Sequence, residues 1–465
     1  MSFLARIKPL GFLLGLMGCA AAAAQASTVS AGLSAAAKTI VGPKTVPSLS
    51  VAIVTHGKVT TQASFGQATP QTAYWIGSAT KTLTATSIMQ LVQQKQLSLD
   101  DSLAKYYPAQ TQWADVTIRN LLDHTSGIPN YLDDAVARRL VLKPTTPQEI
   151  VSNAATQPLR FKPGTDWSYS NTNYVLLGQI VEKISGTTLA QYEQQHIFNI
   201  AGMPHTAVGK APAGATLAPP FVTGAAAKIL GSTPGDPSWY YACGDVISTA
   251  ADMARFDIAL MSGKLLSVAT FALMQQMLPN ETLSDDMRDG LGLFATTYGN
   301  MTLIGHHGGV AGYMTDNEMV PSDSFAVVIM GNGEYNTDTM LDAAMAQQYP
   351  DAARTVALER AKVPPDLSDS RIQQLMLIAN DLVQGKIDRS LFTGTVNAAI
   401  TPAMLSALPV QFAPFGTLEG LKLQKKLYTH GIAVYRFGAT FTHKKATLVV
   451  AFQSDGKIAA LNFLP

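Results

Sequence analysis

The chain has 465 residues, of which 47% are hydrophobic and 14% are charged. This composition allows a large buried core and excludes an intrinsically disordered chain. The 33 Lys and Arg residues nearly balance the 32 Asp and Glu residues, so the sequence lacks the basic footprint of a nucleic-acid-binding protein.

Residues 1–26 have the layout of a cleaved secretory signal peptide. Arg6 and Lys8 form a basic start, an apolar run covers Leu10 to Ala24, and Ala24-Gln25-Ala26 provides a cleavage site. The apolar run is shorter than the roughly 20 residues that cross a bilayer. We therefore expect an exported protein, periplasmic or secreted, with no integral membrane span.

Cys19, one of the two cysteines in the sequence, indicates an alternative way in which the N-terminal segment could be processed. Leu16-Met17-Gly18-Cys19 resembles a bacterial lipoprotein box, in which a lipid anchor would be attached to Cys19. Cleavage after Ala26 would instead leave Cys243 as the single cysteine, and no intrachain disulfide could form. We interpret Cys243 as a small buried residue rather than a nucleophile, because free cysteines are among the most buried residues.

Strand-like segments lie at both ends of the region from 27 to 361. A hairpin turn at His56-Gly57-Lys58 joins two of them near its start, and two more occur near its end. Residues 129–263 between them are mostly helices and loops. The sequence therefore predicts one sheet built from both ends of the region, with a helical insertion. The four strand-like runs are Ser48–Val54, Val59–Phe65, Met301–Ile304 and Phe325–Met330.

A second unit is predicted after a proline-rich break. Lys362 to Asp366 contains paired prolines, which exclude helix, so we place a linker at residues 362–369. Residues 370–465 then contain an amphipathic helix from Arg371 to Gln384 and later strand-like runs, which predicts a small α+β accessory domain. The predicted strands are Leu418–Leu423, Ile432–Phe441 and Leu448–Phe452.

A Ser-x-x-Lys pair on a helix places a hydroxyl and an amine on one face, where the amine can take the hydroxyl proton. The chain contains such pairs at Ser78/Lys81, Ser102/Lys105 and Ser454/Lys457. Of these serines, Ser78 alone opens a long helix, predicted to be buried, after the strand-like run Tyr74-Trp75-Ile76-Gly77. Since a helix N-terminus favours an oxyanion, we select Ser78 as the candidate nucleophile.

A Tyr-x-Asn sequence would add a second proton-transfer group and a polar side chain for the substrate. It occurs at Tyr169-Ser170-Asn171 and at Tyr298-Gly299-Asn300. The second copy lies between strand-like runs and is predicted to be a hairpin turn, whereas the first follows Pro163-Gly164 and precedes a helix. We therefore select Tyr169 and Asn171.

Together these motifs resemble the penicillin-recognising serine hydrolases, the group of class C β-lactamases, DD-peptidases, D-aminopeptidases and related esterases. The resemblance covers most of residues 35–355 and depends on the order and separation of several stretches. They are Ile76–Thr82 with Leu97–Asp101, Thr117–Gly127, Tyr169–Tyr174 and Gly305–Gly309.

The resemblance implies an α+β fold of the β-lactamase and penicillin-binding-protein type over residues 27–361. Such a fold has an antiparallel sheet flanked by helices plus a helical subdomain. Residues 370–465 resemble the cystatin-like or nuclear-transport-factor-like accessory domains that are appended to such hydrolases.

The same resemblance implies roles for individual residues. Ser78 would be acylated, Lys81 and Tyr169 would move its proton, and Asn171 would hold the carbonyl of the substrate. The backbone N–H groups of Ser78 and Gly309 would form an oxyanion hole. Which group acts as the general base is left open.

The Gly305–Gly309 stretch also implies substrate-binding roles for His306, Gly308 and Gly309. His306 stands where many β-lactamases have the Lys of Lys-Thr-Gly, and His307 replaces the usual hydroxyl residue. A Lys attracts a substrate carboxylate, whereas a His with an ordinary pKa of about 6.5 is mostly neutral at pH 7. We therefore expect an ester or a D-amino-acid peptide of the cell-wall type as substrate, rather than chiefly a β-lactam.

No His-Glu-x-x-His sequence or Cys cluster occurs, so we predict no metal site, and we expect no cofactor. His124 is expected to bond loop backbone. The expected partner is a small-molecule or peptide substrate. A β-lactamase and a non-catalytic protein that binds penicillin or cell-wall peptide stay open as alternatives, although the intact set of Ser78, Lys81, Tyr169 and Asn171 favours an enzyme.

Overall fold

The structure is a computed structural model, and it describes seven stretches of the chain. They are residues 29–132, 140–222, 235–278, 287–362, 368–429, 432–452 and 456–464. The predicted signal peptide at 1–26 with Cys19, most of the predicted linker, and Ser454 lie outside the described residues.

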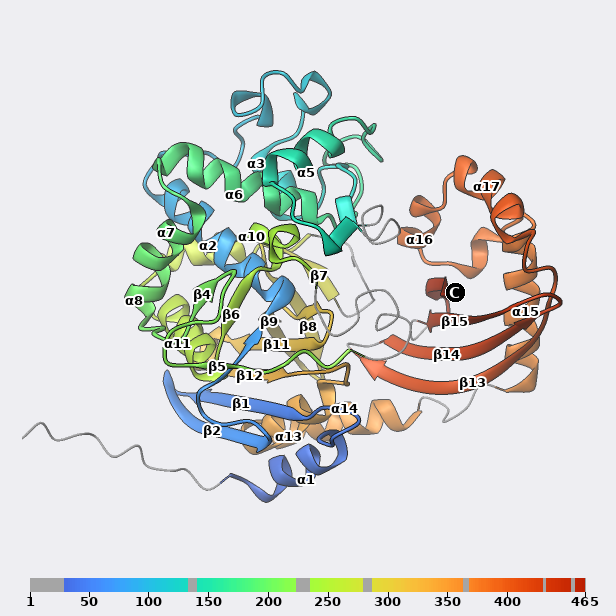
Figure 1. The fold of residues 1–465 in the computed structure, drawn as a ribbon. Helices are drawn as coiled ribbons and strands as arrows, with labels where there is room; N and C mark the ends of the chain where they lie inside the picture. The colour runs from blue at the N-terminus through green and yellow to red at the C-terminus, as the bar shows by residue number, and fades with distance from the viewer. Residues whose placement is uncertain are drawn as a thin grey trace, which may run out of the picture.

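One large antiparallel sheet joins the two ends of the first region, as the sequence predicts (Figure 1). Its strands follow the order β2-β1-β12-β11-β9-β8-β7, with β10 paired to β11. Strand β1 lies antiparallel to β12, with Leu49 opposite Gly331 and Val54 opposite Ala326. The strands are β1 Ser48–Thr55, β2 Lys58–Gly66, β7 Met287–Asp289, β8 Phe294–Tyr298, β9 Met301–Gly305, β10 Gly308–Val310, β11 Tyr313–Val320 and β12 Phe325–Gly331.

Helices cover both faces of this sheet, because alternate residues of its strands point to opposite sides. Ala52 and Val54 of β1 belong to a hydrophobic cluster that includes Phe256 of α11. Val51 and Ile53 belong to a second cluster, on the face covered by α1 and α13. The helices on the two faces are α11 Ala250–Met261 on one, and α1 Ala31–Ile40, α13 Asp338–Gln348 and α14 Pro350–Lys362 on the other.

The part between β2 and β7 is mainly helical, as predicted for residues 129–263, and α3, α5 and α6 lie at the top in Figure 1. It also holds a small sheet in the order β4-β6-β3-β5. Its helices are α2 Thr80–Gln93, α3 Ile118–Leu122, α5 Pro147–Ala154, α6 Asn171–Ser185, α7 Leu189–Glu193, α8 Asn199–Ala201, α10 Tyr241–Gly244 and α12 Val268–Met274. Its strands are β3 Thr72–Trp75, β4 Ala207–Val208, β5 Thr216–Leu217 and β6 Val246–Ser248.

Helix α2 passes through the core and is buried from Thr80 to Leu91, including its polar residues. The threonine hydroxyls have backbone acceptors: Thr82 donates to the carbonyl of Gly292 at 3.0 Å and Thr84 to that of Ala242 at 2.8 Å. Buried hydroxyls are tolerated when they are hydrogen-bonded. The predicted burial of this helix is therefore confirmed, and its polar face is buried as well.

The described residues from 368 onward include a second antiparallel sheet, in the order β13-β14-β15-β16, and helices that precede it. They have their own hydrophobic cluster around Leu375, Phe437 and Leu448. These elements lie beside the main body, orange to red in Figure 1. The predicted helix and strands are present, and β16 is a strand that the sequence analysis missed. The domain limits at 361 and 370 stay a prediction. The elements are α15 Asp369–Val383, α16 Gly394–Ala399, α17 Pro402–Phe412, β13 Leu418–Thr429, β14 Ile432–Phe441, β15 Lys445–Phe452 and β16 Ile458–Leu464.

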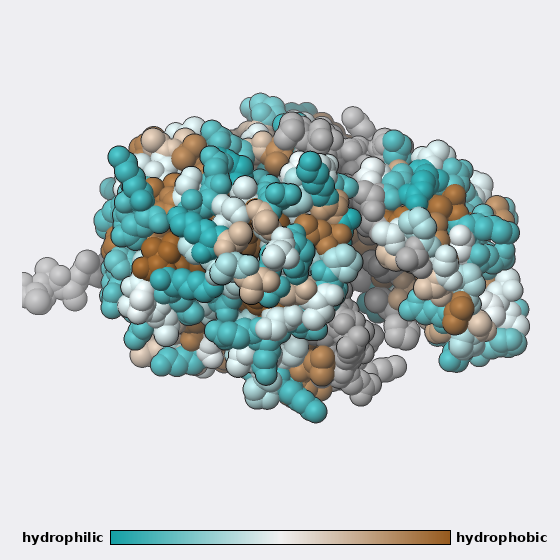
Figure 2. Space-filling view, turned by 90° about the horizontal axis from the view of Figure 1, so that it is seen from above, coloured by the Kyte–Doolittle hydropathy of each residue, from teal (hydrophilic) through white to brown (hydrophobic). Residues whose placement is uncertain are grey.

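Figure 2 shows hydrophilic side chains over much of the face seen from above, with smaller hydrophobic areas scattered between them. Within the described ranges, the structure contains no helix with the length and apolar character needed to cross a membrane.

Candidate active site

Ser78 lies where strand β3 passes into helix α2. A short 3₁₀ turn, Gly77–Ala79, follows the strand and continues directly into the helix at Thr80. Gly77 has a φ of +52°, a conformation that favours glycine. The turn leaves Ser78 half-buried at the mouth of a fully buried helix, as the position of the motif predicted.

Lys81 is completely buried, and its ammonium group is surrounded by hydrogen-bond acceptors. Its Nζ donates to Ser78 Oγ at 3.0 Å, to Asn171 Oδ1 at 2.8 Å and to the carbonyl oxygen of Cys243 at 2.8 Å. Burial lowers the pKa of Lys81 from 10.5 to about 8, against the opposing influence of Cys243 and Asp289. The neutral amine is therefore far more accessible beside the Ser78 hydroxyl near neutral pH than it would be for a solvent-exposed lysine.

The Tyr169 ring lies next to this amine, with Lys81 Nζ 4.9 Å from the ring centroid. Burial raises the pKa of Tyr169, and a hydrogen bond with Ser78 only partly opposes this shift. The phenol therefore keeps its proton at neutral pH. The structure thus brings Ser78, Lys81 and Tyr169 together, as the sequence predicted.

His124 supports the loop that carries Tyr169. It has a φ of +59°, and its Nδ1 accepts hydrogen bonds from the backbone N–H of Ser170 at 3.2 Å and from Asn173 Nδ2 at 3.3 Å. Its ring lies against Tyr169, with centroids 4.4 Å apart. Burial lowers the pKa of His124 well below its ordinary value, and the nearby charge of Lys81 acts in the same direction. The expected bonding of His124 to loop backbone is confirmed, and the ring is neutral with its proton on Nε2.

Asn171 is the first residue of α6 and is held from both sides. Its Oδ1 accepts from Lys81, while its Nδ2 donates to Asn130 Oδ1 at 3.2 Å. Asn130 Oδ1 also accepts from the backbone N–H of Asn171 at 3.2 Å. The sequence analysis selected Asn171 but missed Asn130. The predicted contact of Asn171 with a substrate carbonyl stays a prediction.

Strand β10 packs tightly against the turn that holds Ser78. A Cβ atom added at Gly308 would lie 1.8 Å from the carbonyl oxygen of Ile76, and one added at Gly77 would lie 2.9 Å from the backbone of Gly309. Only glycine fits at Gly308 and Gly77 because these neighbours are backbone atoms. Strand β10, which contains Gly309, therefore lies directly beside the turn that contains Ser78. The oxyanion hole formed by their N–H groups stays a prediction.

His306 is buried at the end of β9. Its Nδ1 donates to the carbonyl oxygen of His307 at 2.7 Å, and its ring lies against Phe294 with centroids 4.7 Å apart. Burial lowers the pKa of His306 well below its ordinary value, and the nearby charge of Lys81 acts in the same direction. The imidazole is therefore neutral over a wider pH range than the sequence alone indicated, and its Nε2 is left as an acceptor.

Two further groups in the site were missed. Asp289, at the end of β7, is buried and accepts a hydrogen bond from Trp167 Nε1 at 2.7 Å. Burial raises its pKa well above the ordinary range, which favours the protonated carboxyl. Cys243 is a small buried residue, as predicted, but its carbonyl oxygen binds Lys81. Every residue has a backbone carbonyl oxygen, so the type of the residue does not indicate that its carbonyl contacts Lys81.

The competing motif copies lie elsewhere. Ser102 caps a short 3₁₀ helix, and Lys105 pairs with Asp101 at 2.9 Å on the surface. Tyr298 ends β8 opposite Met301 of β9, which confirms the predicted hairpin turn.

Comparison with known proteins places these observations in context. The family model described as Beta-lactamase matches residues 33–349, more than half of the chain. The putative penicillin-binding protein PbpX of Bacillus subtilis (strain 168) is 29% identical over 306 residues, covering 61% of this chain and 70% of that protein.

Two solved structures are similar to this chain over nearly their whole length. The D-amino acid amidase of Ochrobactrum anthropi SV3 has a TM-score of 0.60 at 26% identity, covering 68% of this chain and 99% of the amidase. An octameric penicillin-binding protein homologue from Pyrococcus abyssi has a TM-score of 0.60 at 22% identity, covering 92% of this chain and 94% of that one. The latter likeness concerns the fold alone.

Proposed function

The chain belongs to the Beta-lactamase family, and from this membership we propose that it is an exported serine hydrolase that forms an acyl-enzyme on Ser78. The observation that carries this proposal is the 3.0 Å contact between Lys81 Nζ and Ser78 Oγ inside a buried site. An amine with a pKa of about 8 can accept a proton near neutral pH, because an effective general base has a pKa close to the working pH.

In the proposed reaction, Ser78 Oγ bonds to the substrate carbonyl carbon and its proton passes to the neutral amine of Lys81. The backbone N–H groups of Ser78 and Gly309 hold the negative oxygen. The proton then moves to the leaving group through the Tyr169 phenol as the bond to that group breaks. Water next attacks the acyl carbonyl and gives up a proton, which restores the Ser78 hydroxyl.

We propose an ester or a D-amino-acid peptide or amide as substrate, rather than chiefly a β-lactam. His306 supports this choice, because a buried neutral imidazole cannot attract a substrate carboxylate as a Lys would. The likeness to a D-amino acid amidase at 26% identity also supports it.

The test is labelling with a fluorophosphonate, which reacts with activated serine hydroxyls. Ser78→Ala should abolish the label, and Ser102→Ala is the matched control, because it removes the hydroxyl of another Ser-x-x-Lys pair. The control should label like the wild type. Equal labelling of wild type and Ser78→Ala would contradict the proposal, and absence of label from all three proteins would favour a non-catalytic binder.

The substrate class requires a parallel screen of p-nitrophenyl esters, D-alanyl and D-phenylalanyl p-nitroanilides, their L-isomers, and nitrocefin. We expect turnover of esters and of the D-isomers, at rates at least about tenfold above those for the L-isomers and nitrocefin. A dominant rate on nitrocefin would instead identify a β-lactamase.

Export is proposed from residues 1–26, with lipid attachment at Cys19 as the alternative. N-terminal sequencing of protein recovered from a bacterial host distinguishes these possibilities. A start at Ser27 supports cleavage by the ordinary signal peptidase, whereas a blocked, acylated Cys19 supports the lipoprotein. A retained Met1 on cytoplasmic protein contradicts export.

We also propose that residues 370–465 are a separate accessory domain. Their own sheet and hydrophobic cluster support this division. Limited proteolysis should cut between 362 and 369 and leave two stable fragments. Degradation of the whole chain without any stable fragment would contradict the division into two domains.

A further inference from the structure

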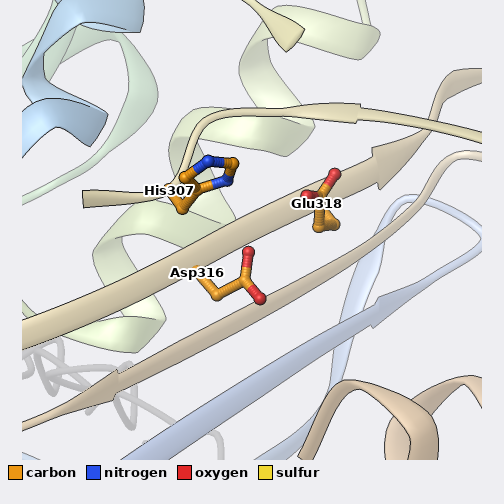
Figure 3. A group of neighbouring side chains, drawn as sticks. All are labelled: His307, Asp316 and Glu318. Atoms are coloured by element: carbon orange, nitrogen blue, oxygen red, sulfur yellow. The ribbon is translucent and has the colours of Figure 1, made fainter. Parts of the chain in front are cut away.

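Three potential metal ligands meet on the large sheet, outside the groups used in the proposed reaction. Asp316 and Glu318 are alternate residues of β11, so their side chains point to the same face. His307 lies between β9 and β10. One ligand atom from each residue lies within 4.8 Å of the other two, and Figure 3 shows the imidazole and the two carboxylates gathered together.

The neighbours of these two acids on the adjacent strand β12 are apolar. Asp316 lies opposite Ile329 of β12, and Glu318 lies opposite Val327. Both neighbours belong to the hydrophobic cluster on the face covered by α1 and α13. Asn317, between the two acids, points to the other face, where it donates to Asp257 of α11 at 2.9 Å. The cross-strand neighbours therefore provide no positive charge for the acids.

Asp316 makes the arrangement unusual. It is 0% exposed, and in the described part of the chain neither of its carboxylate oxygens has a hydrogen-bond partner. Glu318 is 3% exposed, so both carboxylates are withdrawn from solvent. A buried carboxylate with no partner is strongly destabilising, so a proton or a cation must balance the charge of Asp316.

We propose that His307, Asp316 and Glu318 bind a Zn²⁺ ion. One imidazole nitrogen and two carboxylate oxygens form a donor set that suits zinc, with water as a fourth ligand. In a tetrahedral site with metal–ligand bonds of about 2.0 to 2.2 Å, the ligand atoms lie roughly 3.4 Å apart. Side-chain movements of about 1 Å would bring the ligand atoms of the three residues to this spacing. The sequence analysis predicted no metal site because these ligands follow no compact motif and are brought together only by strand pairing.

Such an ion would fix the strand that lines the active site. His307 directly precedes Gly308 and Gly309, and its carbonyl oxygen accepts from His306. Zinc would tie this segment to β11 from the face of the sheet opposite to α11, while the hydrolytic groups remain on the other side. Its proposed role is structural, and the test below does not depend on hydrolysis.

The experiment uses the full chain, treated with EDTA, dialysed and titrated with Zn²⁺ by calorimetry, with zinc content measured by mass spectrometry after desalting. We expect one Zn²⁺ per chain, a dissociation constant below about 10 µM, and a melting temperature at least about 5 °C higher with zinc. Asp316→Asn keeps the shape of the side chain but should weaken binding by at least about 100-fold. His307→Gln should do the same, which provides a second variant if the first does not fold.

Asp115→Asn is the matched control, because Asp115 is an exposed acid far from the cluster in sequence, and it should bind zinc like the wild type. The proposal is overturned if the wild type binds no zinc, or if Asp316→Asn and His307→Gln both bind as tightly as the wild type. It is also overturned if Ca²⁺ or Mg²⁺ binds in preference to Zn²⁺. A more stable Asp316→Asn together with a zinc-free wild type would show that the two acids share a proton instead.

Discussion

The imidazole of His124 packs against the Tyr169 ring in a tilted arrangement, with 4.4 Å between the ring centroids and 40° between the ring planes. We predict that His124→Ala lowers kcat by about 10²-fold through displacement of Tyr169. Because burial keeps His124 neutral, the shape of the pH–rate profile should stay the same. Steady-state kinetics from pH 5.5 to 9 check both points.

A matched variant separates positioning from acid–base chemistry at this residue. His124→Asn keeps a side chain that tolerates the positive φ and should retain more activity than His124→Ala. Loss of an ionisation from the pH profile in either variant would contradict a purely positioning role.

Gly308 and Gly309 are predicted to respond differently to the same substitution. Gly308→Ala would force a Cβ atom to 1.8 Å from the Ile76 carbonyl oxygen, whereas Gly309→Ala meets only the flexible end of Met314 at 3.3 Å. We expect Gly308→Ala to lose at least about 3 kcal/mol of unfolding free energy and Gly309→Ala to lose less than about 1 kcal/mol. Urea unfolding measures both, and similar losses for the two variants would contradict the packing described.

The buried amine of Lys81 should make stability depend on pH. Its pKa is 10.5 when unfolded and about 8 when folded. Between these values the unfolded chain binds more protons, so the free energy of unfolding rises as the pH increases from about 8 to about 10.5. Below pH 8 both states hold the proton, and the contribution is constant.

The measurement compares wild type with Lys81→Met by urea unfolding at several pH values, so that other titrating groups cancel. The difference in unfolding free energy should change by roughly 3 kcal/mol in favour of the wild type across this interval. Parallel stability curves for the two proteins would show that the amine keeps an ordinary pKa. Lys81→Met should also lose hydrolytic activity.

The hydrogen bond from Trp167 to Asp289 is predicted to stabilise the loop beside the site. Asp289→Ala would leave the half-buried Trp167 Nε1 without its acceptor and should cost about 1 to 3 kcal/mol. Asp289→Asn keeps an acceptor oxygen and resembles the protonated carboxyl favoured by burial, so its loss should be below about 1 kcal/mol. Thermal unfolding distinguishes them, and a larger loss for Asn than for Ala would refute the assignment.

Sequence reasoning located the parts of the site that depend on local geometry. Ser78 and Lys81 are three residues apart on one helical turn, so their contact follows from helix periodicity. The loop carrying Tyr169 and Asn171 was found because a helix follows directly after it. The presence of strands from both ends of the region in one sheet also followed from strand-like runs with helical sequence between them, whereas the pairing of β1 with β12 is seen only in the structure.

The contacts of the site that sequence reasoning did not find depend on tertiary packing. The carbonyl of Cys243 contacts the site only because α10 packs against α2, and the side chain of Asn130 does so only because the segment after α3 lies against the start of α6. Asp289 stands at a strand end with no motif around it. The cluster of His307, Asp316 and Glu318 requires the pairing of β10 with β11, which neither composition nor spacing specifies.

The central claim is that the Ser78 hydroxyl becomes covalently attached to the acyl group. The most direct measurement is peptide mass spectrometry of protein quenched with acid during turnover of a slow ester. We expect an acyl mass increase on the peptide that contains Ser78, retained in Ser102→Ala and absent from Ser78→Ala. An acyl group found on any other residue, with Ser78 unmodified, would contradict it.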